Sequence, residues 1–351
     1  MTQRGVARYF RQVIDGLITH FGQQVTIFSA QARDYGSARH IRAIPRFRGS
    51  GRLMIYKANE HLAAWYAERE RAAVFYSPYF GNAQTKAAPA FTVYDMIFEL
   101  YPQHFPDAVI TQSFILEKKR CFERAALLLA ISQSTARDIT ACYPKIDSSK
   151  IVTTLLGVDD FFFAADRQPS CNQKPYLLYV GDRGGYKNFR RLLQAFGQSG
   201  LAKDFDLRVI SPGPAGFGVD EVELLQCYHL ENSVHLQLAV SDTSLRDSYA
   251  GATVFVYPSE YEGFGLPLLE AMASGTVVTT SNTSSMPEIG GDVAFYFDPF
   301  SVESIAGCLW RSVNLTSDER CLRIAQGIDR AHTFTWAHCL RQTVDAIARL
   351  L

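Results

Sequence analysis

Short apolar segments alternate with helical patterns throughout the second half of the chain. The predicted strands read YLLYV, FDLRVIS, VHLQ, TVFVYP, TVVTT and AFYF, and each is followed by a helix or a tight loop. Strands that are apolar along their whole length belong to parallel sheets covered by helices on both faces. The pattern therefore predicts a doubly wound α/β domain, in which ligands bind beyond the carboxyl ends of the strands.

The first half of the chain shows the same alternation less regularly. Strand candidates there are QVTIFS, AVFYS, AFTVYD, LLLAIS and KIVTTL, with helical stretches between several of them. A length of 351 residues suits two domains. We therefore predict an α/β protein made of two Rossmann-like domains whose parallel sheets face each other across a cleft.

The domain boundary is expected in the polar segment 164–175, AADRQPSCNQKP, which carries two prolines and almost no periodicity. We assign residues 1–165 to the first domain and 172–334 to the second, with a final helix at about 335–351 that packs back on the first domain. The chain starts almost directly on a helix. Either a strand precedes Met1 in the natural product, or the first sheet lacks one strand.

Composition excludes several classes of function. Lysine plus arginine and aspartate plus glutamate both number 35, so the zero net charge provides no overall field that would attract nucleic acid. Seven scattered cysteines without a C-x-x-C pair indicate reduced thiols rather than a disulfide framework or a zinc knuckle. No apolar run reaches the ~18 residues of a membrane-spanning helix, and no signal peptide is visible. We expect a cytoplasmic protein, at most at the inner face of a membrane.

The stretch YPSEYEGFGLPLLEAMASG, residues 257–275, places two carboxylates around a strand-to-helix junction. The turn at 262–265 holds two glycines, which let backbone N–H groups approach a ligand, and the N-terminus of the following helix favours an anion. Glu262 in that turn would repel a phosphate, so we expect it to face neutral sugar hydroxyls. Glu270, about two turns along the helix, is placed to accept hydrogen bonds from the vicinal hydroxyls of a ribose. Sugar, phosphate and ribose together indicate a nucleotide-sugar.

The alternative interpretation treats Glu262 as a solvated loop acid and Glu270 as an ordinary helix glutamate. An isolated pair of acids usually has that explanation. Here the buried strand before the turn, the glycines of the turn, Pro267 in the first helical turn and Gly275 at the helix end favour a binding site.

A second stretch, YLLYVGDRGGYKNFRRLLQAF, supplies positive charge at the carboxyl end of the first strand of this domain. Arg183 and Lys187 project from its glycine-rich turn. They suit the diphosphate of a departing nucleotide, because the charge of that group grows as the glycosidic bond breaks. The alternative is that the cations of this stretch lie on the surface, which is the expectation for Arg190 and Arg191 on the following helix.

With these two stretches, the chain resembles the retaining glycosyltransferases of family 4 (group 1). The resemblance covers nearly the whole chain and is strongest in the C-terminal half. It is carried by YVGDRGGYKNF, SEYEGFGLPLLEAMASGTVV, SNTSSMPEIGGDVAFYFDP, KIVTTLLGVDDFF, TQRGVARYF and TVYDMIFELYPQHF. It implies the GT-B fold and hexosyl transfer, with retention at the anomeric carbon, from a nucleoside diphosphate sugar to a saccharide or lipid-linked acceptor.

The resemblance also implies roles for individual residues. Glu262 would contact the donor sugar, Glu270 the ribose, and Arg183 with Lys187 the diphosphate. From the other domain, Gly5 would lie close to the donor phosphates. Backbone groups would add contacts to sugar, phosphate and base, from Gly263, Phe264, Gly265 and Leu266 in the turn and from the segment Leu236 to Ser241, including Leu238.

The chain departs from the family pattern at Tyr94-Asp95, where many members carry His-Asp. The family histidine typically touches the donor sugar near the reacting carbon. Tyr94 can still donate one hydrogen bond, but it cannot become cationic near neutral pH. Asp95 either orients the acceptor or the sugar, or is a buried structural acid, and both interpretations stay open.

Three weaker signals point away from metal, nicotinamide and serine chemistry. DFD, residues 204–206, matches the Asp-x-Asp of metal-dependent glycosyltransferases, but it precedes its strand; we interpret it as a surface turn and expect no essential metal. GPAGFG, from residue 213, fits a dinucleotide fingerprint only loosely, so we expect no nicotinamide cofactor. Ser132 in ISQST lacks the glycines of a nucleophile elbow and is interpreted as a helix cap.

A basic stretch spans residues 39–57, with no acid between Asp34 and Glu60. Apolar residues are interleaved with its cations, a composition that suits an anionic membrane surface or a lipid-diphosphate acceptor. A solvated loop and helix face is the competing interpretation. The cations are Arg39, Arg42, Arg46, Arg48, Arg52 and Lys57.

The base and the sugar are not determined by side-chain patterns, because base contacts in this fold are largely made by the backbone. We favour UDP and a gluco-configured hexose, with GDP-mannose as the close alternative. A nucleotide-sugar epimerase is a further alternative, although it needs a titratable acid–base pair that we do not locate. A non-catalytic nucleotide-sugar-binding protein is another, disfavoured by the intact set Arg183, Lys187, Glu262 and Glu270.

Overall fold

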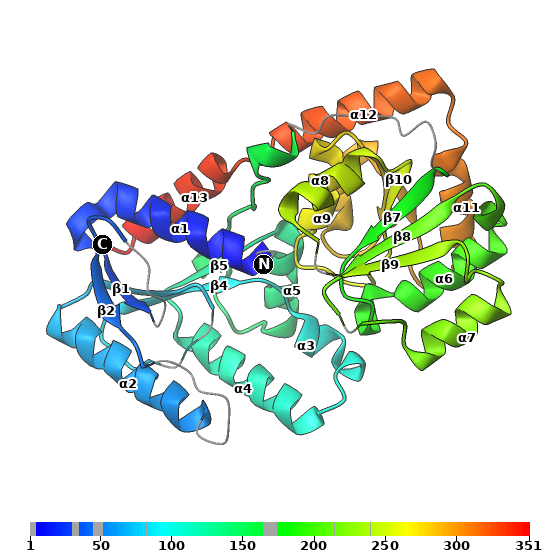
Figure 1. Ribbon diagram of the computed structural model, residues 1–351. Helices are drawn as coiled ribbons and strands as arrows, with labels where there is room; N and C mark the ends of the chain where they lie inside the picture. The colour runs from blue at the N-terminus through cyan, green and yellow to red at the C-terminus, as the bar shows by residue number, and fades with distance from the viewer. Residues whose placement is uncertain are drawn as a thin grey trace. The chain divides into compact units, whose positions relative to one another are not determined.

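The computed structural model describes residues 5–29, 35–44, 52–79, 81, 83–163, 174–213, 215–238 and 240–351. The chain divides into two compact units. The C-terminal unit comprises Leu156–Thr335, and the N-terminal unit comprises residues 5–155 together with Trp336–Leu351. In Figure 1 the N-terminal unit is therefore drawn in blue to green-cyan plus red, and the C-terminal unit in green to orange. Each unit is described by itself.

The C-terminal unit is built on one six-stranded sheet with the order β12-β11-β10-β7-β8-β9. Every pairing in it is parallel, as the unbroken apolar segments predict. All six strand predictions for this half of the chain are confirmed. The strands are β7 Tyr176–Val180, β8 Asp206–Ser211, β9 Val234–Leu238, β10 Val254–Tyr257, β11 Val277–Ser281 and β12 Phe295–Phe297.

The strand order reverses between β7 and β10. From β7 the chain adds β8 and then β9 on one side of the sheet, whereas β10, β11 and β12 are added on the other. Connections on the two sides of such a point diverge and leave a crevice beyond the carboxyl ends of the strands. The sequence stretches that start at Gly181 and Pro258 follow these two strands. Both predicted binding turns therefore lie at the switch point.

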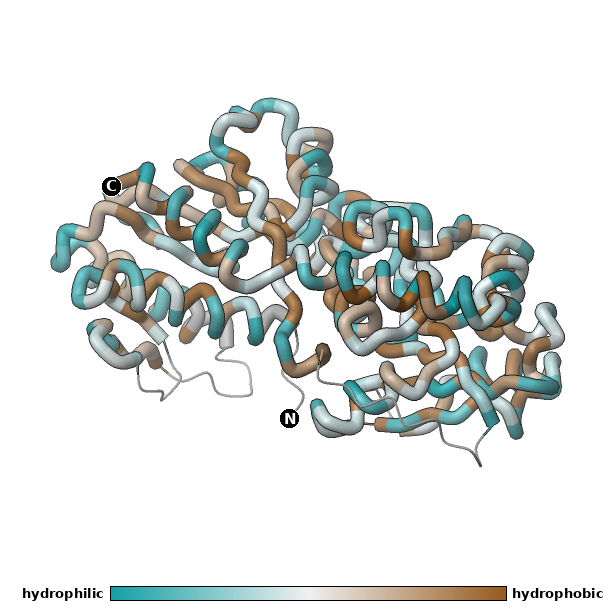
Figure 2. The backbone as a smooth tube through the Cα atoms, turned by 90° about the horizontal axis from the view of Figure 1, so that it is seen from above, coloured by the Kyte–Doolittle hydropathy of each residue, from teal (hydrophilic) through white to brown (hydrophobic). Residues whose placement is uncertain are grey.

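Helices lie on both faces of this sheet (Figure 1). Hydrophobic and hydrophilic stretches alternate along much of the chain in Figure 2. A hydrophobic core lies against one face, where Leu177, Tyr179 and Val209 pack among side chains such as Phe196 and Leu309. Pro267 and Gly275 bracket the helix that follows β10, as the sequence predicts. The helices are α6 Phe189–Gln198, α7 Val219–Cys227, α8 Asp242–Ala250, α9 Leu266–Ala273, α10 Met286–Gly290, α11 Val302–Val313 and α12 Ser317–His332.

The connection between the units lies partly within the C-terminal unit. Residues 156–163, which the sequence assigns to the first domain, are grouped with the second in the structure. Phe162 explains this difference, because its ring is fully buried and meets Tyr249 edge to face at 6.1 Å. Ser274 also donates a hydrogen bond to the Phe162 carbonyl at 3.3 Å. Most of the predicted linker, residues 164–173, lies outside the described residues.

The N-terminal unit contains two parallel sheets among its described strands. One is the pair β1-β2, and the other has the order β3-β4-β5-β6. The sequence predicts a single sheet here. The structure differs because periodicity identifies strands but not which strands pair with each other. The strands are β1 Thr26–Ser29, β2 Arg39–Arg42, β3 Val74–Ser77, β4 Ala88–Val93, β5 Leu127–Ala130 and β6 Ile151–Thr153. The prediction that Ser132 caps a helix is confirmed, since its hydroxyl accepts from Thr135 N at 2.9 Å.

The last helix of the chain packs on the first. Gly16 marks the contact, because a Cβ at this position would lie 2.7 Å from Leu340 Cδ2. Glycine thus permits the close approach of these two helices. The helices of the unit are α1 Gly5–Phe21, α2 Arg52–Arg69, α3 Ile97–Leu100, α4 Ala108–Arg124, α5 Gln133–Cys142 and α13 Trp336–Ala348.

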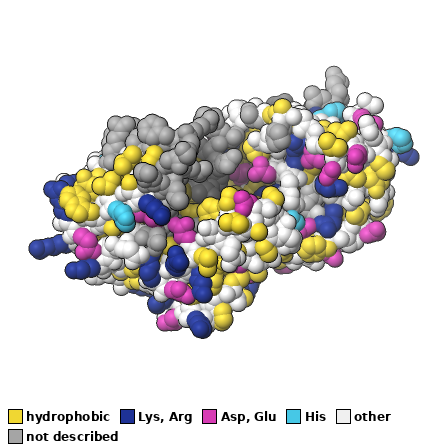
Figure 3. Space-filling view, turned by 90° about the horizontal axis from the view of Figure 1, so that it is seen from below, with side chains coloured by type: hydrophobic (Ala, Val, Ile, Leu, Met, Phe, Trp, Pro, Cys, Tyr) yellow, Lys and Arg dark blue, Asp and Glu magenta, His cyan; other side chains and the backbone are white. Residues whose placement is uncertain are grey.

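The basic stretch 39–57 is only partly described, and Arg46 and Arg48 lie outside the described residues. Arg39 on β2 forms an ion pair with Glu70 at 2.6 Å. On the face shown in Figure 3, basic and acidic side chains are interspersed. Within the described part of the chain, no helix combines the length and the apolar character that crossing a bilayer requires.

Replacement of Phe162 by alanine should destabilise the C-terminal unit by about 3–5 kcal/mol, the usual cost of truncating a fully buried phenylalanine. Phe161, its neighbour in the same helical turn, is 38% exposed. Phe161→Ala should therefore cost only about 1 kcal/mol. Urea denaturation followed by circular dichroism measures both, and equal losses would contradict the assignment of residues 156–163 to this unit.

Candidate functional site

Two turns stand side by side at the switch point of the C-terminal sheet. β7 and β10 are neighbours, with Leu177 opposite Val254, so their carboxyl ends meet at one edge. A backbone hydrogen bond joins the turns, from Glu260 N to Tyr186 O at 2.7 Å. Sequence alone identified both turns but not this direct connection.

Asn188 strengthens the connection from a buried position. Its side-chain amide donates to the carbonyl oxygens of Pro258 at 3.0 Å and Pro299 at 2.7 Å. Its backbone φ of 60° lies in the left-handed region, which asparagine tolerates better than most residues. The residue therefore ends the first turn and holds the second in place.

Arg191 also joins the two turns, although its side chain is 36% exposed and the sequence predicts only a surface residue. Its guanidinium donates to Asn188 Oδ1 at 2.7 Å and forms an ion pair with the buried Glu260. Side chains on a helix point back toward its N-terminus, so the Arg191 side chain lies over the turn that precedes α6. Arg190 behaves as predicted, because it and its partner Asp220 are both largely exposed.

Lys187 and Glu262 form a nearly buried ion pair between the turns. Lys187 Nζ lies 2.6 Å from Glu262 Oε1, and the two side chains are only 15% and 13% exposed. The ammonium also donates to the hydroxyl of Tyr257 at 3.4 Å. The structure thus brings together two residues that the sequence assigned separately to a diphosphate and to a sugar.

The charges of this pair determine how the site titrates. Burial is the largest single influence and opposes the charge of Lys187, but Glu262, Tyr257 and Tyr186 together outweigh it and raise the pKa of the lysine well above its ordinary value. Burial, with the negative charge of Glu262, also raises the pKa of Tyr257 well above its usual range. At neutral pH the site therefore holds an ammonium and a neutral phenol.

The Glu262 turn is supported by two serines that the sequence analysis did not assign. Glu262 N donates to Ser284 Oγ at 3.0 Å. The fully buried Ser285 hydroxyl lies 2.8 Å from Glu262 O and 2.7 Å from Phe264 O, and donates to these carbonyls. Both serines lie in the segment SNTSSMPEIGG, directly before the helix α10, which has a proline in its first turn. Two consecutive hydroxyl residues at that place were the sequence signal that could have identified them.

Gly265 completes this turn with a conformation that other residues disfavour. Its φ is 113°, and a Cβ there would lie 2.7 Å from Met286 Cε. Glycine is therefore required both by the backbone and by the space available. The glycine sits directly before α9, so the backbone N–H groups at the start of that helix follow the turn.

Arg183 has a different set of partners from Lys187. Its guanidinium donates to Glu221 Oε2 at 2.8 Å and to Gly216 O at 2.7 Å, and it lies 5.3 Å from the centre of the Phe217 ring. The side chain is 6% exposed. These contacts join the turn after β7 to α7 and to the segment before it.

Glu270 lies inside α9 and is 6% exposed. The hydroxyl of Tyr249 donates to its Oε2 at 3.1 Å. Glutamate is seldom buried to this extent without a partner, and Tyr249 provides one.

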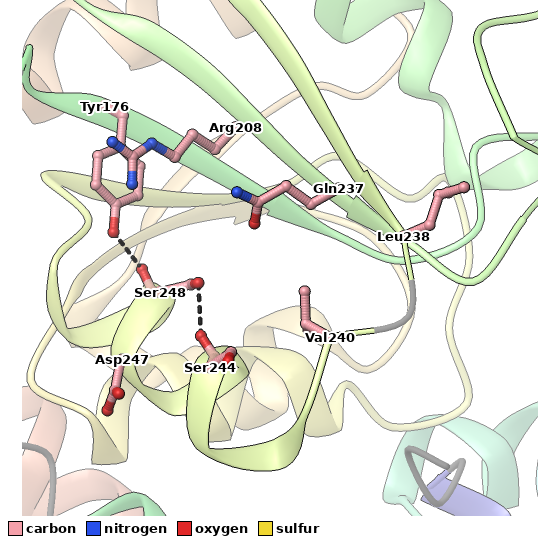
Figure 4. Close-up of a pocket in the computed structure, with 8 residues that line it drawn as sticks. All are labelled: Tyr176, Arg208, Gln237, Leu238, Val240, Ser244, Asp247 and Ser248. Carbon is pink, nitrogen blue, oxygen red and sulfur yellow. Dashed lines mark hydrogen bonds between the residues drawn. The ribbon is translucent and has the colours of Figure 1, made fainter.

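A pocket of about 650 Å³ lies between the sheet and α8 (Figure 4). The Arg208 guanidinium covers the Tyr176 ring at 3.7 Å, and the Tyr176 hydroxyl donates to Ser248 O at 2.8 Å. Leu238 and Val240 also line the pocket, so it reaches the segment expected to contact a base. None of Lys187, Glu262 and Glu270 is among its lining residues, which are Tyr176, Arg208, Gln237, Leu238, Val240, Ser244, Asp247 and Ser248.

Three predicted site residues belong to the N-terminal unit. Gly5 is the first residue of α1. Tyr94 follows β4, and its hydroxyl is buried without a hydrogen-bond partner among the described residues. Asp95 accepts a hydrogen bond from Ile97 N at 3.1 Å, while its own carbonyl accepts from Lys118 at 3.2 Å.

The DFD segment lies away from the carboxyl edge of the sheet. Asp206 is the first residue of β8, as expected, and its carboxylate pairs with Lys174 and His235, each at 3.3 Å. Over the described ranges, no three His, Cys, Asp or Glu side chains are grouped so that they could hold a metal ion.

Comparison with known proteins gives consistent results. The family model "Glycosyl transferases group 1" matches residues 162–320. The chain is 30% identical to O-antigen chain mannosyltransferase B of Escherichia coli over 293 residues, which are 81% of this chain and 76% of that protein. It is 28% identical to the serotype-specific mannosyltransferase WbdA of Escherichia coli over 256 residues, but spans only 31% of that longer protein.

A solved structure shares the fold at low sequence identity. Sucrose-phosphate synthase from Thermosynechococcus elongatus superposes with a TM-score of 0.78 and 18% identity. The match covers 99% of this chain and 93% of that one. At this identity the likeness concerns the fold alone.

Replacement of Glu262 by glutamine should cost about 3 kcal/mol of stability at pH 7, because it leaves the Lys187 ammonium buried without its counter-charge. In the native protein the pKa of Lys187 is raised, so its contribution is complete below the unfolded pKa and is lost only as pH rises through the folded value. In the variant, burial alone would lower this pKa, so the unfolded state would bind more protons and stability should rise with pH. The difference in the free energy of unfolding between Glu262→Gln and the native protein should therefore become smaller between about pH 8 and 10.

Urea denaturation at several pH values measures this narrowing. Asp220→Asn provides the matched control, since it breaks the exposed Arg190–Asp220 pair of the same unit and should change stability little. If the loss of stability caused by Glu262→Gln did not depend on pH, Lys187 would not be the group that the substitution leaves without a counter-charge.

Proposed function

Because the chain belongs to the group 1 glycosyl transferases and has the GT-B fold, we propose that it transfers a hexosyl group from a nucleoside diphosphate sugar to a hydroxyl acceptor in glycan synthesis. The observation that carries the proposal is the Lys187–Glu262 pair at the switch point of the sheet. A cation and a carboxylate side by side, next to backbone N–H groups, match a ligand that carries both a diphosphate and neutral hydroxyls.

Lys187 is proposed to neutralise the departing diphosphate. Its ammonium has three N–H donors, and the bonds to Glu262 and Tyr257 account for two of them. Since the pKa of Lys187 is raised, the positive charge persists throughout the neutral range. Negative charge grows on the leaving phosphate in the transition state, where a preorganised cation stabilises it most.

Arg183 is proposed to act mainly by holding the turn that presents Lys187. Its guanidinium donates to Glu221 and to Gly216 O, which join the turn after β7 to α7 and the segment before it. Direct contact with a diphosphate, as the family resemblance implies, is the alternative role, in which the guanidinium would donate to the phosphate oxygens. The two roles differ in their effect on binding of the diphosphate product, which only direct contact would weaken strongly.

The two carboxylates are proposed to recognise the neutral parts of the donor. Glu262 would accept hydrogen bonds from hydroxyls of the hexose, and Glu270 from the ribose. The base would lie along the backbone of Leu236–Ser241, where the pocket of Figure 4 reaches Leu238 and Val240. Ser284 and Ser285 would keep the Glu262 turn in the conformation that this recognition needs.

The proposed reaction proceeds with retention by attack on the face from which the nucleotide departs. The bond between the anomeric carbon and the phosphate oxygen breaks, and a bond to the acceptor oxygen forms on the same face. The acceptor proton passes to the departing phosphate oxygen. The protein contributes by holding the reactants in line and by stabilising the diphosphate.

The names of the relatives favour mannose as the transferred sugar. Two Escherichia coli proteins that align with most of this chain are called mannosyltransferases. We therefore propose GDP-mannose as the donor, in preference to the UDP-glucose that sequence reasoning favoured. UDP-glucose remains the second candidate.

Incubation with a panel of GDP- and UDP-hexoses, with and without a saccharide acceptor, should release nucleotide fastest from GDP-mannose. Free nucleotide, free sugar and transferred sugar are measured by chromatography. Conversion of the donor to another nucleotide-sugar without nucleotide release would indicate an epimerase. Binding without turnover under all conditions would indicate a non-catalytic protein.

Glu262→Ala should lower transfer by about 10²–10³-fold, because the donor sugar loses its carboxylate contact. Binding of the plain nucleoside diphosphate should be retained, because Lys187 is still present and the diphosphate supplies the negative charge that Glu262 no longer provides. Lys187→Ala should weaken binding of both donor and diphosphate, measured by calorimetry. Arg190→Ala, on the exposed side of α6, is the control and should match the native protein. Unchanged diphosphate affinity in Lys187→Ala would refute the role given to this residue.

A further inference from the structure

A buried ion pair connects three helices of the N-terminal unit. Lys118 Nζ on α4 lies 2.8 Å from Glu99 Oε2 on α3, and the two side chains are only 2% and 7% exposed. The other oxygen of this carboxylate accepts a hydrogen bond from the hydroxyl of Tyr143 at 2.8 Å. Tyr143 directly follows α5. Glu99 therefore links the short helix α3, which lies beside α4 in Figure 1, to both longer helices.

Lys118 also holds the segment that follows β4. Its ammonium donates to the backbone carbonyl of Asp95 at 3.2 Å. The carboxylate of Asp95 accepts a hydrogen bond from Ile97 N, at the start of α3, at 3.1 Å. The same ammonium lies 5.8 Å from the centre of the Phe98 ring. One buried cation thus contacts this segment at Asp95, at Phe98 and, through its ion pair, at Glu99.

Stability alone does not explain why charges are buried here. The cost of taking a lysine and a glutamate out of water is often not offset by their attraction, and apolar side chains of similar size would stabilise the fold as well. Hydrogen bonds, unlike apolar packing, require particular positions of donor and acceptor. Burial and the negative charge of Glu99 also raise the pKa of Tyr143 above its ordinary value, so its hydroxyl remains a donor. The network is therefore suited to fixing one conformation of the segment.

Asp95 lies where α/β proteins bind their ligands. β4 is an inner strand of the sheet β3-β4-β5-β6 and is parallel to both neighbours. Asp95 is the second residue beyond the carboxyl end of β4 and is partly exposed. Ligands of open α/β sheets bind at this edge. A carboxylate has lone pairs for about four hydrogen bonds, which suits the hydroxyl groups of a saccharide.

We propose that Lys118 and Glu99 are positioning residues, which hold Asp95 so that its carboxylate accepts a hydrogen bond from the saccharide acceptor. The inference rests on the proposed function and deepens it. The donor is assigned to residues of the C-terminal unit, whereas this pair acts on the second substrate. Neither Lys118 nor Glu99 touches the acceptor. They act through the backbone of Asp95, and Tyr143 supports them through Glu99.

A double substitution separates positioning from stability. Lys118→Met leaves Glu99 buried without its counter-charge, so the thermal midpoint should fall by about 10 °C. Glu99→Gln, added to it, removes the remaining charge, while the amide oxygen can still accept from Tyr143. Lys118→Met/Glu99→Gln should therefore regain a thermal midpoint within about 3 °C of the native protein. It still lacks the hydrogen bond to the carbonyl of Asp95.

Hydrogen exchange followed by mass spectrometry tests the positioning role without any turnover. In the double variant, the amides of residues 95–101 should exchange at least about 10-fold faster than in the native protein, while those of the C-terminal unit stay unchanged. Lys119→Met is the matched control, because Lys119 is the next residue of α4 and its pair with Glu123 is about half exposed. Native exchange over residues 95–101 in the double variant would overturn the proposal.

Kinetics connect the segment to the acceptor. The donor is GDP-mannose and the acceptor is methyl α-D-mannopyranoside. In the double variant, transfer to the glycoside should fall by at least about 10-fold relative to slow hydrolysis of the donor, because a misplaced acceptor loses its alignment. Calorimetric binding of GDP should stay within about 2-fold of the native value. A native ratio of transfer to hydrolysis in the stable double variant would contradict the role given to the pair.

Tyr143→Phe provides a milder test should the double variant not regain its stability. It removes one hydrogen bond to Glu99 and keeps both charges, so the ratio of transfer to hydrolysis should fall by about 3-fold. Exchange over residues 95–101 should rise in the same variant, and unchanged exchange would again overturn the proposal. Failure of the native protein to transfer from any donor would count against the proposed function, whereas hydrogen exchange decides the positioning role independently.

Discussion

The direct connection between the turns after β7 and β10 is the constraint on which the rest of the site depends. The hydrogen bond from Glu260 N to Tyr186 O places the two turns at a fixed separation. The side-chain amide of Asn188 holds the second turn by donating to the Pro258 carbonyl. Only with this separation can Lys187 of one turn reach Glu262 of the other at 2.6 Å. The switch point provides the crevice, and these bonds determine which side chains meet in it.

Burial of charge in this region is explained better by binding than by stability. Removing a lysine and a glutamate from water costs several kcal/mol per ion, and their mutual attraction repays this only in part. Two well-packed apolar side chains in place of this ion pair would stabilise the fold equally well. The arrangement around Lys187 and Glu262, with Arg183–Glu221 holding the neighbouring segment, keeps charged groups preorganised for a ligand that exchanges with them.

Much of the fold and part of the site could be predicted from local patterns. The strands, the glycine-rich turns, the bounds Pro267 and Gly275 of α9, and the cap at Ser132 each depend on residues a few positions apart. The partner of Arg183, the role of Arg191 between the turns and the support from Ser285 could not be predicted in the same way. Each joins residues 20 or more positions apart, such as Arg183 with Glu221 and Arg191 with Glu260.

The sequence by itself determined which segments are strands and helices and which turns carry glycines and charges, because these properties follow from periodicity and local backbone preference. The tertiary structure decided that Lys187 pairs with Glu262 while Arg183 pairs with Glu221. It also decided that the N-terminal strands form two sheets, and that Lys118 pairs with Glu99. The physical reason is that strand partners and side-chain contacts depend on distances in space, which a linear pattern does not contain.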